Sequence, residues 1–140
     1  MDFWLLDTGP VVAFLDARDA EHDRVAAVLG AFTGQLVTTS AVVVEAMHFL
    51  GGAASGAGLL VDFLLTSQTV IHDCTTPEGL TEATELMAKY ADTPMDFADA
   101  TLVLLGERLK IYSVCTLDRR GFRTYRTRRR KAFRLALDDN

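Results

Sequence analysis

A length of 140 residues suits one domain, and a composition of 49% hydrophobic and 24% charged residues suits a compact fold with a sizeable core. No apolar run approaches the roughly 20 residues of a membrane helix, and the first residues lack the basic start of a signal peptide. We therefore expect one cytoplasmic domain over residues 1–140 with no membrane segment. Cys74 and Cys115 lie far apart in strand-like stretches and are expected to be reduced core residues.

The net charge of −5 hides an asymmetry. Residues 1–118 hold 5 basic and 17 acidic residues, a net charge of −12, whereas residues 119–140 hold 9 basic and 2 acidic residues, a net charge of +7. A basic segment that begins at about residue 119 on an acidic body predicts an anionic partner at one edge. A merely solubilising tail would have the same composition.

The apolar patterns alternate between short β-like runs and runs with helical spacing. Strands are predicted at 3–6, 35–39, 69–74, 111–116 and, at the end, 132–137. Helices are predicted at 9–17, 21–32, 41–50, 58–65, 77–91 and 97–109. Ser40 is a plausible N-cap, and "GGAASGAG" at 51–58 reads as a flexible connection. Alternating elements with apolar strands predict an α/β fold whose mainly parallel sheet is covered on both faces.

Four acidic residues interrupt this apolar framework. Asp7 directly follows the first strand, and Asp118 follows the strand at 111–116, so a parallel sheet places both at its carboxyl edge. Glu45 lies within an apolar helix, and Asp99 begins another. A buried carboxylate costs several kcal/mol unless it is paired or bound to a metal, and residues 1–118 offer few cations. The pattern therefore indicates a divalent-metal site.

Each acid also has a purely structural explanation. Asp7 could cap the first helix, and Asp118 could be a turn residue. Glu45 could belong to a polar stripe or reach an arginine. Asp96 and Asp99 could cap a helix and interact with its dipole, which is the explanation we favour for Asp96. The four acids together, at two strand ends and on two apolar helices, are harder to explain in this way than any one alone.

Four motifs in order resemble a known family. They are "LLDTGPVVAFLD", "TTSAVVVEAMHFL", "DFADATLVLLGERL" and "VCTLDRRGFRTYR", and they extend from the first strand to the basic segment. Together they resemble a PIN-domain ribonuclease, specifically a VapC-type toxin of a toxin–antitoxin pair. The resemblance implies a PIN-like three-layer α/β/α sandwich and a metal-dependent endoribonuclease, the toxin of a type II system. It also implies a cognate antitoxin protein and a homodimer.

The resemblance implies that Asp7, Glu45, Asp99 and Asp118 form the catalytic, metal-binding quartet, with Asp7 and Asp99 as principal ligands. We favour Asp99 over Asp96 because the acid of the family directly precedes a run such as "ATL". Hard carboxylate oxygens suit Mg²⁺ or Mn²⁺, and no cluster of His and Cys favours zinc. The hydroxyls of Thr8 and Thr116 are placed to orient a water or a phosphate oxygen.

A basic segment beside an acidic site is expected to bind RNA, because arginine binds phosphates and stacks on bases. The candidate RNA-binding residues are Arg119, Arg120, Arg123, Arg126, Arg128, Arg129 and Arg130. Tyr125 among them is a candidate for stacking, whereas Phe122 and Phe133 are expected to be core anchors.

Other functions fit the same residues less well. A haloacid-dehalogenase-like phosphatase needs a second Asp at the position of Gly9, and a response-regulator receiver needs an acidic pair after the first strand and a late lysine. A non-catalytic PIN-like module that only binds RNA or protein, or a housekeeping PIN nuclease, stays open as an alternative.

Overall fold

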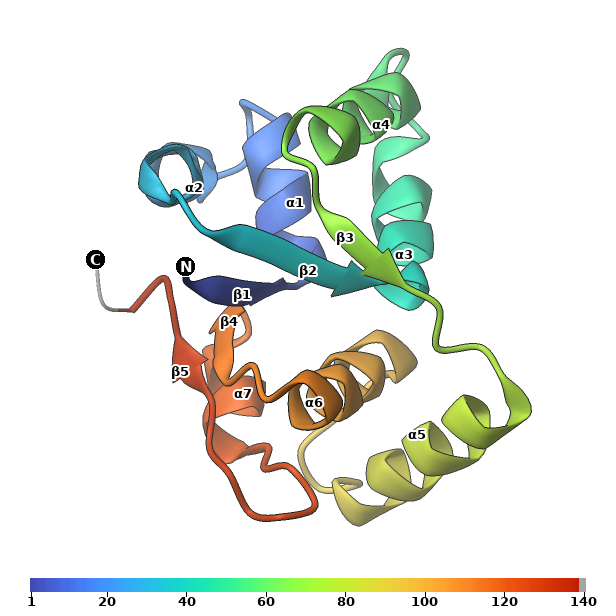
Figure 1. The fold of residues 1–140 in the computed structure, drawn as a ribbon. Helices are drawn as coiled ribbons and strands as arrows, with labels where there is room; N and C mark the ends of the chain where they lie inside the picture. Colours follow the sequence, from blue (N-terminus) through green and yellow to red (C-terminus); the bar gives the residue numbers. More distant parts are fainter. Residues whose placement is uncertain (139–140) are drawn as a thin grey trace.

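The computed structural model describes residues 1–138, and their centre is a five-stranded sheet (Figure 1). Its strands are β1 (Phe3–Leu6), β2 (Gln35–Thr39), β3 (Val70–His72), β4 (Ser113–Cys115) and β5 (Arg134–Leu135). They lie in the order β3-β2-β1-β4-β5, and every pairing of neighbours is parallel. The predicted α/β class with a parallel sheet is confirmed.

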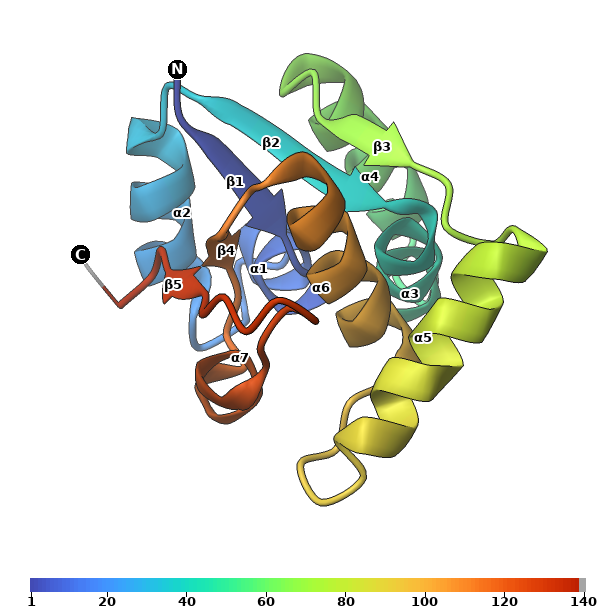
Figure 2. The same ribbon diagram turned by 60° about the horizontal axis from the view of Figure 1, so that its bottom comes forward.

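Helices cover both faces of this sheet (Figures 1 and 2). The helices are α1 (Thr8–Leu15), α2 (His22–Ala31), α3 (Ser40–Leu50), α4 (Gly56–Thr66), α5 (Pro77–Lys89), α6 (Phe97–Leu109) and α7 (Arg119–Thr124). The first four lie on one side of the sheet and the last three on the other. This is the three-layer α/β/α sandwich that the sequence analysis expected.

The central strand β1 shows why its residues are apolar throughout. Successive side chains of a strand point to opposite faces, so Trp4 and Leu6 join the core beneath α1 to α4. Leu5 points the other way and joins the core beneath α5 to α7. Because both faces are covered from Trp4 to Leu6, these residues have no solvent-facing side that would favour polar residues, whereas Phe3 at the start of β1 is exposed.

The order of the strands reverses at the central strand β1. The chain proceeds from β1 to β2 and β3 on one side, and it then places β4 and β5 on the other. The carboxyl ends of β1 and β4 stay in contact, because the Asp7 amide donates to the Cys115 carbonyl at 3.0 Å. In open α/β sheets the crevice at such a point is where ligands bind.

Two local expectations were wrong around α3 and α4. Thr39, not Ser40, caps α3, since Thr39 is extended and its side chain accepts the Val42 amide at 3.3 Å. The connection expected over 51–58 ends earlier, because α4 already begins at Gly56. A Cβ at position 56 would collide with the Leu50 carbonyl, so a glycine serves a close approach here rather than flexibility.

The basic segment is folded into the domain. It contributes α7 and the edge strand β5, and Phe122 and Phe133 are buried as predicted. Tyr125 is also completely buried, and its hydroxyl donates to the Pro94 carbonyl at 2.7 Å. The expectation that Tyr125 stacks on RNA bases was therefore wrong, because the ring packs edge-on against Phe122 instead.

Both cysteines are free thiols. Cys115 lies in the core, as predicted, whereas Cys74 follows β3 and is partly exposed. Within residues 1–138, no helix has the length and apolar character that crossing a membrane requires.

We predict opposite effects of two glycine-to-alanine substitutions in helices. A Cβ at Gly106 in α6 would lie 2.6 Å from the Ile111 carbonyl oxygen and 3.0 Å from Leu5, so Gly106→Ala should destabilise the fold by about 1–3 kcal/mol. Gly58 in α4 has open space around it, so Gly58→Ala should stabilise by up to about 1 kcal/mol through helix propensity. Urea denaturation measures both, and a Gly106→Ala protein as stable as the parent would contradict the packing described here.

Candidate active site

Asp7 is held rigidly at the end of β1. It is the N-cap of α1, and its Oδ1 accepts the Thr8 amide at 2.8 Å. Its Oδ2 accepts the Thr116 hydroxyl, at the end of the neighbouring strand β4, at 2.7 Å. Only 7% of Asp7 is exposed. The carboxylate is thus both a cap and a buried charge that points into the crevice between β1 and β4.

Asp118 is tied to the same hydroxyl. Its backbone amide donates to Thr116 Oγ1 at 3.0 Å, so this one side chain links Asp7 to Asp118. The Asp118 carboxylate caps α7 by accepting the Gly121 amide at 2.9 Å. A Cβ at position 121 would collide with that carboxylate, which explains the glycine. Thr116 therefore positions the two acids rather than completing the strand.

Asp96 and Asp99 share the start of α6 in a reciprocal capping box. Asp96 Oδ1 accepts the Asp99 amide at 2.8 Å, and Asp99 Oδ2 accepts the Asp96 amide at 3.1 Å. The two acids differ in burial, since Asp99 is 8% exposed while Asp96 lies open to solvent. The capping box gives both acids a structural role, but capping alone does not explain why Asp99 is buried.

Six carboxylates line one cavity of about 470 Å³, which we call the acidic cavity. They come from six places in the chain, namely Asp7, Asp19, Glu45, Asp96, Asp99 and Asp118. The four acids of the predicted quartet are all among them. Among residues 1–138, no Lys, Arg or His lines this cavity, and no ion pair involves a member of the quartet.

Asp19 is the acid that the sequence analysis missed. It lies in the turn between α1 and α2, where its carboxylate accepts the Glu21 amide at 2.9 Å. Its stretch, "DARDAEHD", looks like an ordinary charged loop, and nothing in it marks one acid as special. The only usable signal is its position shortly after a helix that itself starts at Asp7.

The pKa values show the cost of this arrangement. Burial raises the pKa of Asp7 from 3.8 to about 6, although hydrogen bonds from Thr116 and Thr8 oppose the shift. Burial, followed by the negative charges of Asp7 and Asp96, raises the pKa of Asp99 to about 8. Both causes disfavour the ionised carboxylates, so a bound cation would be favoured here.

The donor chemistry fits a hard divalent cation. Six of the eleven lining residues are Asp or Glu, and among residues 1–138 the buried hydroxyl of Thr8 has no hydrogen-bond partner. An unpartnered buried hydroxyl is costly, and it is a suitable neighbour for a water or a phosphate oxygen. Within residues 1–138, however, no three His, Cys, Asp or Glu side chains already form a group that could hold a metal.

The sequence model of the PIN domain family matches residues 4–127, which span the whole acidic cavity. The chain belongs to the PIN domain family. A relative named ribonuclease VapC26, from Mycobacterium tuberculosis strain ATCC 25618 / H37Rv, is 26% identical over 127 residues. The aligned region covers 87% of this chain and 91% of that protein.

A solved structure shares the fold. The crystal structure of Mycobacterium tuberculosis VapC20, described as a sarcin-ricin loop cleaving toxin, matches with a TM-score of 0.75 and 18% identity. The match covers 84% of this chain and 91% of that chain. At this identity the likeness concerns the fold, and it confirms the PIN-like sandwich.

The arginines of this PIN domain fall into two groups. Arg119, Arg120 and Arg123 belong to α7 and begin immediately after Asp118, beside the acidic cavity. Arg126 folds back on its own chain, donating to the carbonyls of Arg123, Thr124 and Tyr125. Only the α7 group therefore adjoins a residue of the acidic cavity along the chain, and a basic rim that binds RNA there stays a prediction.

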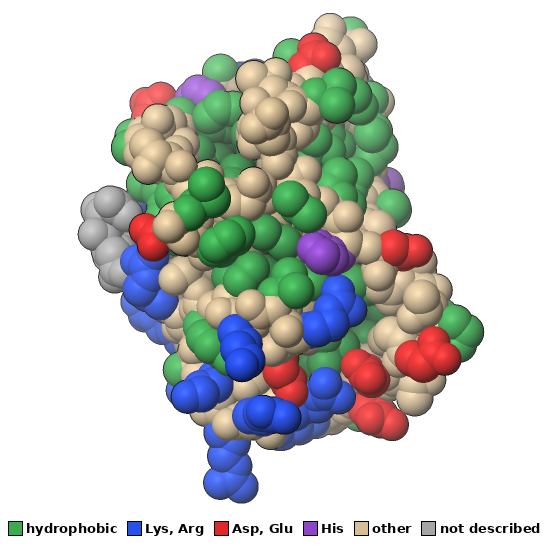
Figure 3. Space-filling view, viewed as in Figure 1, with side chains coloured by type: hydrophobic (Ala, Val, Ile, Leu, Met, Phe, Trp, Pro, Cys, Tyr) green, Lys and Arg blue, Asp and Glu red, His purple; other side chains and the backbone are tan. Residues whose placement is uncertain are grey.

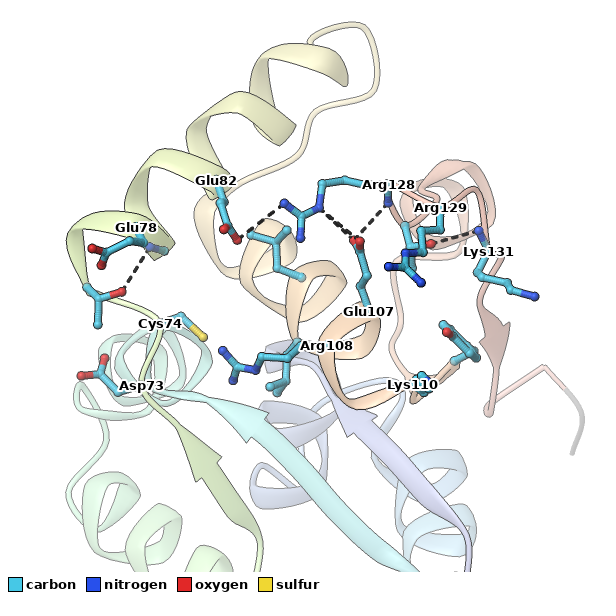
Figure 4. A pocket seen from close by; sticks show the side chains of 16 residues that line it. Asp73, Cys74, Glu78, Glu82, Glu107, Arg108, Lys110, Arg128, Arg129 and Lys131 are labelled. Atoms are coloured by element: carbon cyan, nitrogen blue, oxygen red, sulfur yellow. Dashed lines mark hydrogen bonds and ion pairs between the residues drawn. The ribbon is translucent and has the colours of Figure 1, made fainter.

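Arg128, Arg129 and Arg130 lie elsewhere, in the turn before β5. Arg128 donates to Glu107 at 3.1 Å and approaches Glu82 at 3.8 Å, as Figure 4 shows. Glu107 is eight residues beyond Asp99 on α6, so this turn lies roughly 12 Å farther along the helix axis. Arg128 and Arg129 line a groove of about 820 Å³ between α5 and the end of α6.

Basic side chains gather over this part of the surface (Figure 3). The groove has Arg108, Lys110 and Lys131 on its basic side, and Asp73 and Glu78 lie across it (Figure 4). The mixture of charges contrasts with the acidic cavity, where no cation lines the wall. RNA contacts by Arg128 to Arg130 stay a prediction, and such contacts would be remote from the cavity.

We predict that the metal-free protein becomes less stable as pH rises from about 4 to about 8 on account of Asp7 and Asp99. Their raised folded-state pKa values, about 6 and about 8, mean that the folded protein holds protons that the unfolded chain has lost above its pKa of 3.8. Raising the pH removes those protons and costs folding free energy. Urea denaturation in EDTA across this range measures the slope.

The matched control is Asp99→Asn, which cannot titrate at position 99 and should flatten the slope. An equally steep slope in this variant would show that Asp99 does not titrate as described.

Proposed function

We propose that this PIN domain is a Mg²⁺- or Mn²⁺-dependent endoribonuclease that hydrolyses RNA phosphodiester bonds, and that it acts in the cytoplasm as the toxin of a type II toxin–antitoxin pair. The observation that carries the proposal is the acidic cavity, which gathers six carboxylates without any cation in its lining. The relative named ribonuclease VapC26, aligned over 91% of its length, supports the reaction type.

Asp7, Glu45, Asp99 and Asp118 would hold the metal. When bound, the cation supplies acidification of water and neutralisation of charge on the scissile phosphate. The protein contributes the rest. Thr116 fixes the carboxylate of Asp7 and the backbone of Asp118, as outer hydrogen bonds fix the ligands of metal sites.

Thr8 has a separate task in this proposal. Its buried, unpartnered hydroxyl would donate to the attacking water or to a phosphate oxygen and so orient it. Asp99, with its pKa raised to about 8, holds a proton at neutral pH in the metal-free protein. That proton leaves when a cation binds, so metal affinity should increase with pH.

A partner must restrain such an enzyme in the cell. We propose a cognate antitoxin, and the acidic cavity has the charge to receive an arginine side chain from it. The homodimer that the family resemblance implies stays a prediction, which light scattering of the purified chain measures.

The main test compares Asp99→Asn with Asp96→Asn. Asn preserves the reciprocal capping box at both positions, because it can still accept a backbone amide, so both variants should fold. Asp99→Asn removes a buried charge that a hard cation requires, and it should abolish cleavage and weaken Mn²⁺ binding strongly. Asp96→Asn removes an exposed charge and should do much less.

The measurements are RNA cleavage with mapped ends, with and without Mg²⁺ or Mn²⁺, and Mn²⁺ binding by calorimetry. Full activity of Asp99→Asn, or equal loss in both variants, would show that the acids are assigned wrongly. RNA binding by pure wild-type protein without metal-dependent cleavage would favour a non-catalytic PIN module.

The toxin assignment has its own test. Induced expression of the wild-type chain alone should arrest growth of a bacterial host, and Asp99→Asn, which keeps the fold, should not. Colony counts after induction measure the effect. Normal growth with a wild-type protein that cleaves RNA in vitro would indicate a housekeeping nuclease instead.

A further inference from the structure

Three arginines converge on one carboxylate in a part of the molecule that the proposed chemistry does not use. Arg119 Nε lies 2.8 Å from Asp138 Oδ1, and Arg123 donates to Asp138 Oδ2 at 2.7 Å. Arg24 lies 3.6 Å from the same Oδ1 and donates to the Leu137 carbonyl at 2.8 Å. We call these three arginines and Asp138 the arginine cluster.

The cluster joins three segments that are distant in sequence. Arg24 belongs to α2, the other two arginines to α7, and Asp138 lies just after β5 (Figure 2). Two of its segments are joined along the chain to residues that line the acidic cavity. Arg119 is the residue after Asp118, and the turn that carries Asp19 leads directly into α2.

The charges in the cluster do not balance. Arg24 also pairs with Glu21 at 3.2 Å, so three guanidinium groups face two carboxylates. Side-chain exposures of 54% for Arg119 and 63% for Arg123 leave these arginines accessible, whereas Asp138 beneath them is 18% exposed. An anion from solvent can therefore reach the arginines from the open side.

Asp138 shows which ligand chemistry the cluster accepts. Its Oδ2 accepts a guanidinium donor of Arg123 at 2.7 Å, and Arg119 Nε lies 2.8 Å from its Oδ1 in an ion pair. A phosphodiester offers two non-bridging oxygens in a similar arrangement, and arginine binds both groups through its fork of donors. By contrast, Arg128 is held by Glu107 and Glu82 at the far end of α6.

We propose that Arg24, Arg119 and Arg123 form a phosphate-binding site for the RNA backbone beside the acidic cavity, and that Asp138 occupies it until an RNA phosphate replaces it. The inference deepens the proposed function and rests on RNA being the substrate. It gives the acidic cavity the local positive charge that it needs to retain a polyanion. It also makes Asp138 a built-in competitor that keeps RNA affinity low.

The test measures binding of a short fluorescein-labelled single-stranded RNA of mixed sequence, in EDTA, by anisotropy over a range of salt concentrations. Asp138→Asn should bind about fivefold more tightly than wild type at low salt, the order expected for the release of two partly exposed ion pairs. The slope of log affinity against log salt should steepen by up to about 0.7, the value for one phosphate contact on a single strand.

Asp62→Asn is the matched control, because it removes the same charge from an exposed position on α4 that forms no ion pair within residues 1–138. A gain in RNA affinity confined to Asp138→Asn supports the site. An equal gain in both variants would overturn the proposal, because it would show that only the net charge of the protein matters. Unchanged RNA affinity of Asp138→Asn, together with a lowered melting temperature, would also overturn the proposal, because Asp138 would then only stabilise the fold.

Arg123→Gln provides a second variant that does not depend on how Asp138→Asn folds. It should weaken RNA binding and flatten the salt slope by about 0.7, and an unchanged slope would count against the site. Metal-dependent cleavage by wild type is scored separately. Absence of cleavage together with the expected binding changes would defeat the nuclease proposal while leaving the phosphate site intact.

Discussion

Repulsion among carboxylates that the fold gathers around one cavity is the constraint on which this molecule depends. Burial and mutual charge raise the pKa of Asp7 to about 6 and that of Asp99 to about 8. Within residues 1–138 the cavity lining provides no cation to offset them. Other interactions must hold the carboxylates in place against this repulsion. Here these interactions are backbone hydrogen bonds at helix starts and strand ends.

Those hydrogen bonds explain why each acid also looks like a structural residue. Asp7, Asp96 and Asp118 cap α1, α6 and α7, and Asp99 completes the capping box of α6. Capping and metal binding are not exclusive, because a cap uses one lone pair of a carboxylate that has about four. Holding an acid by a helix start also limits its rotamers, which keeps the remaining oxygens aimed into the cavity. The capping explanations offered for Asp7, Asp96 and Asp99 were therefore correct without excluding a functional role, whereas Asp118 caps a helix instead of lying in the expected turn.

The sequence predicted most of the fold, because each strand and each of the first six helices has its own apolar pattern and the parallel topology follows from their alternation. It missed α7, whose six residues are mostly polar. It predicted Asp7 and Asp118 as neighbours for the same reason, since both follow strands of one parallel sheet. It could not predict that Asp19 joins them, because that depends on how α2 packs against α1 and not on any local pattern. The burial of Tyr125 and the division of the arginines depend likewise on tertiary packing, which no local composition encodes.

The arginines of α7 and those of the turn before β5 differ in how far they can help an acidic site to bind a polyanion. Charges more than about 8–10 Å apart and exposed to solvent are largely screened at physiological salt, so the exposed turn at Arg128 contributes little to attracting RNA at the mouth of the acidic cavity. The positive groups that matter there are those of α7, which follow Asp118 directly. Asp138 neutralises part of that charge in the free protein. If the phosphate-binding site proposed above exists, affinity for RNA depends on the charges of α2, α7 and the residue Asp138 after β5 rather than on the nine basic residues of the segment as a whole.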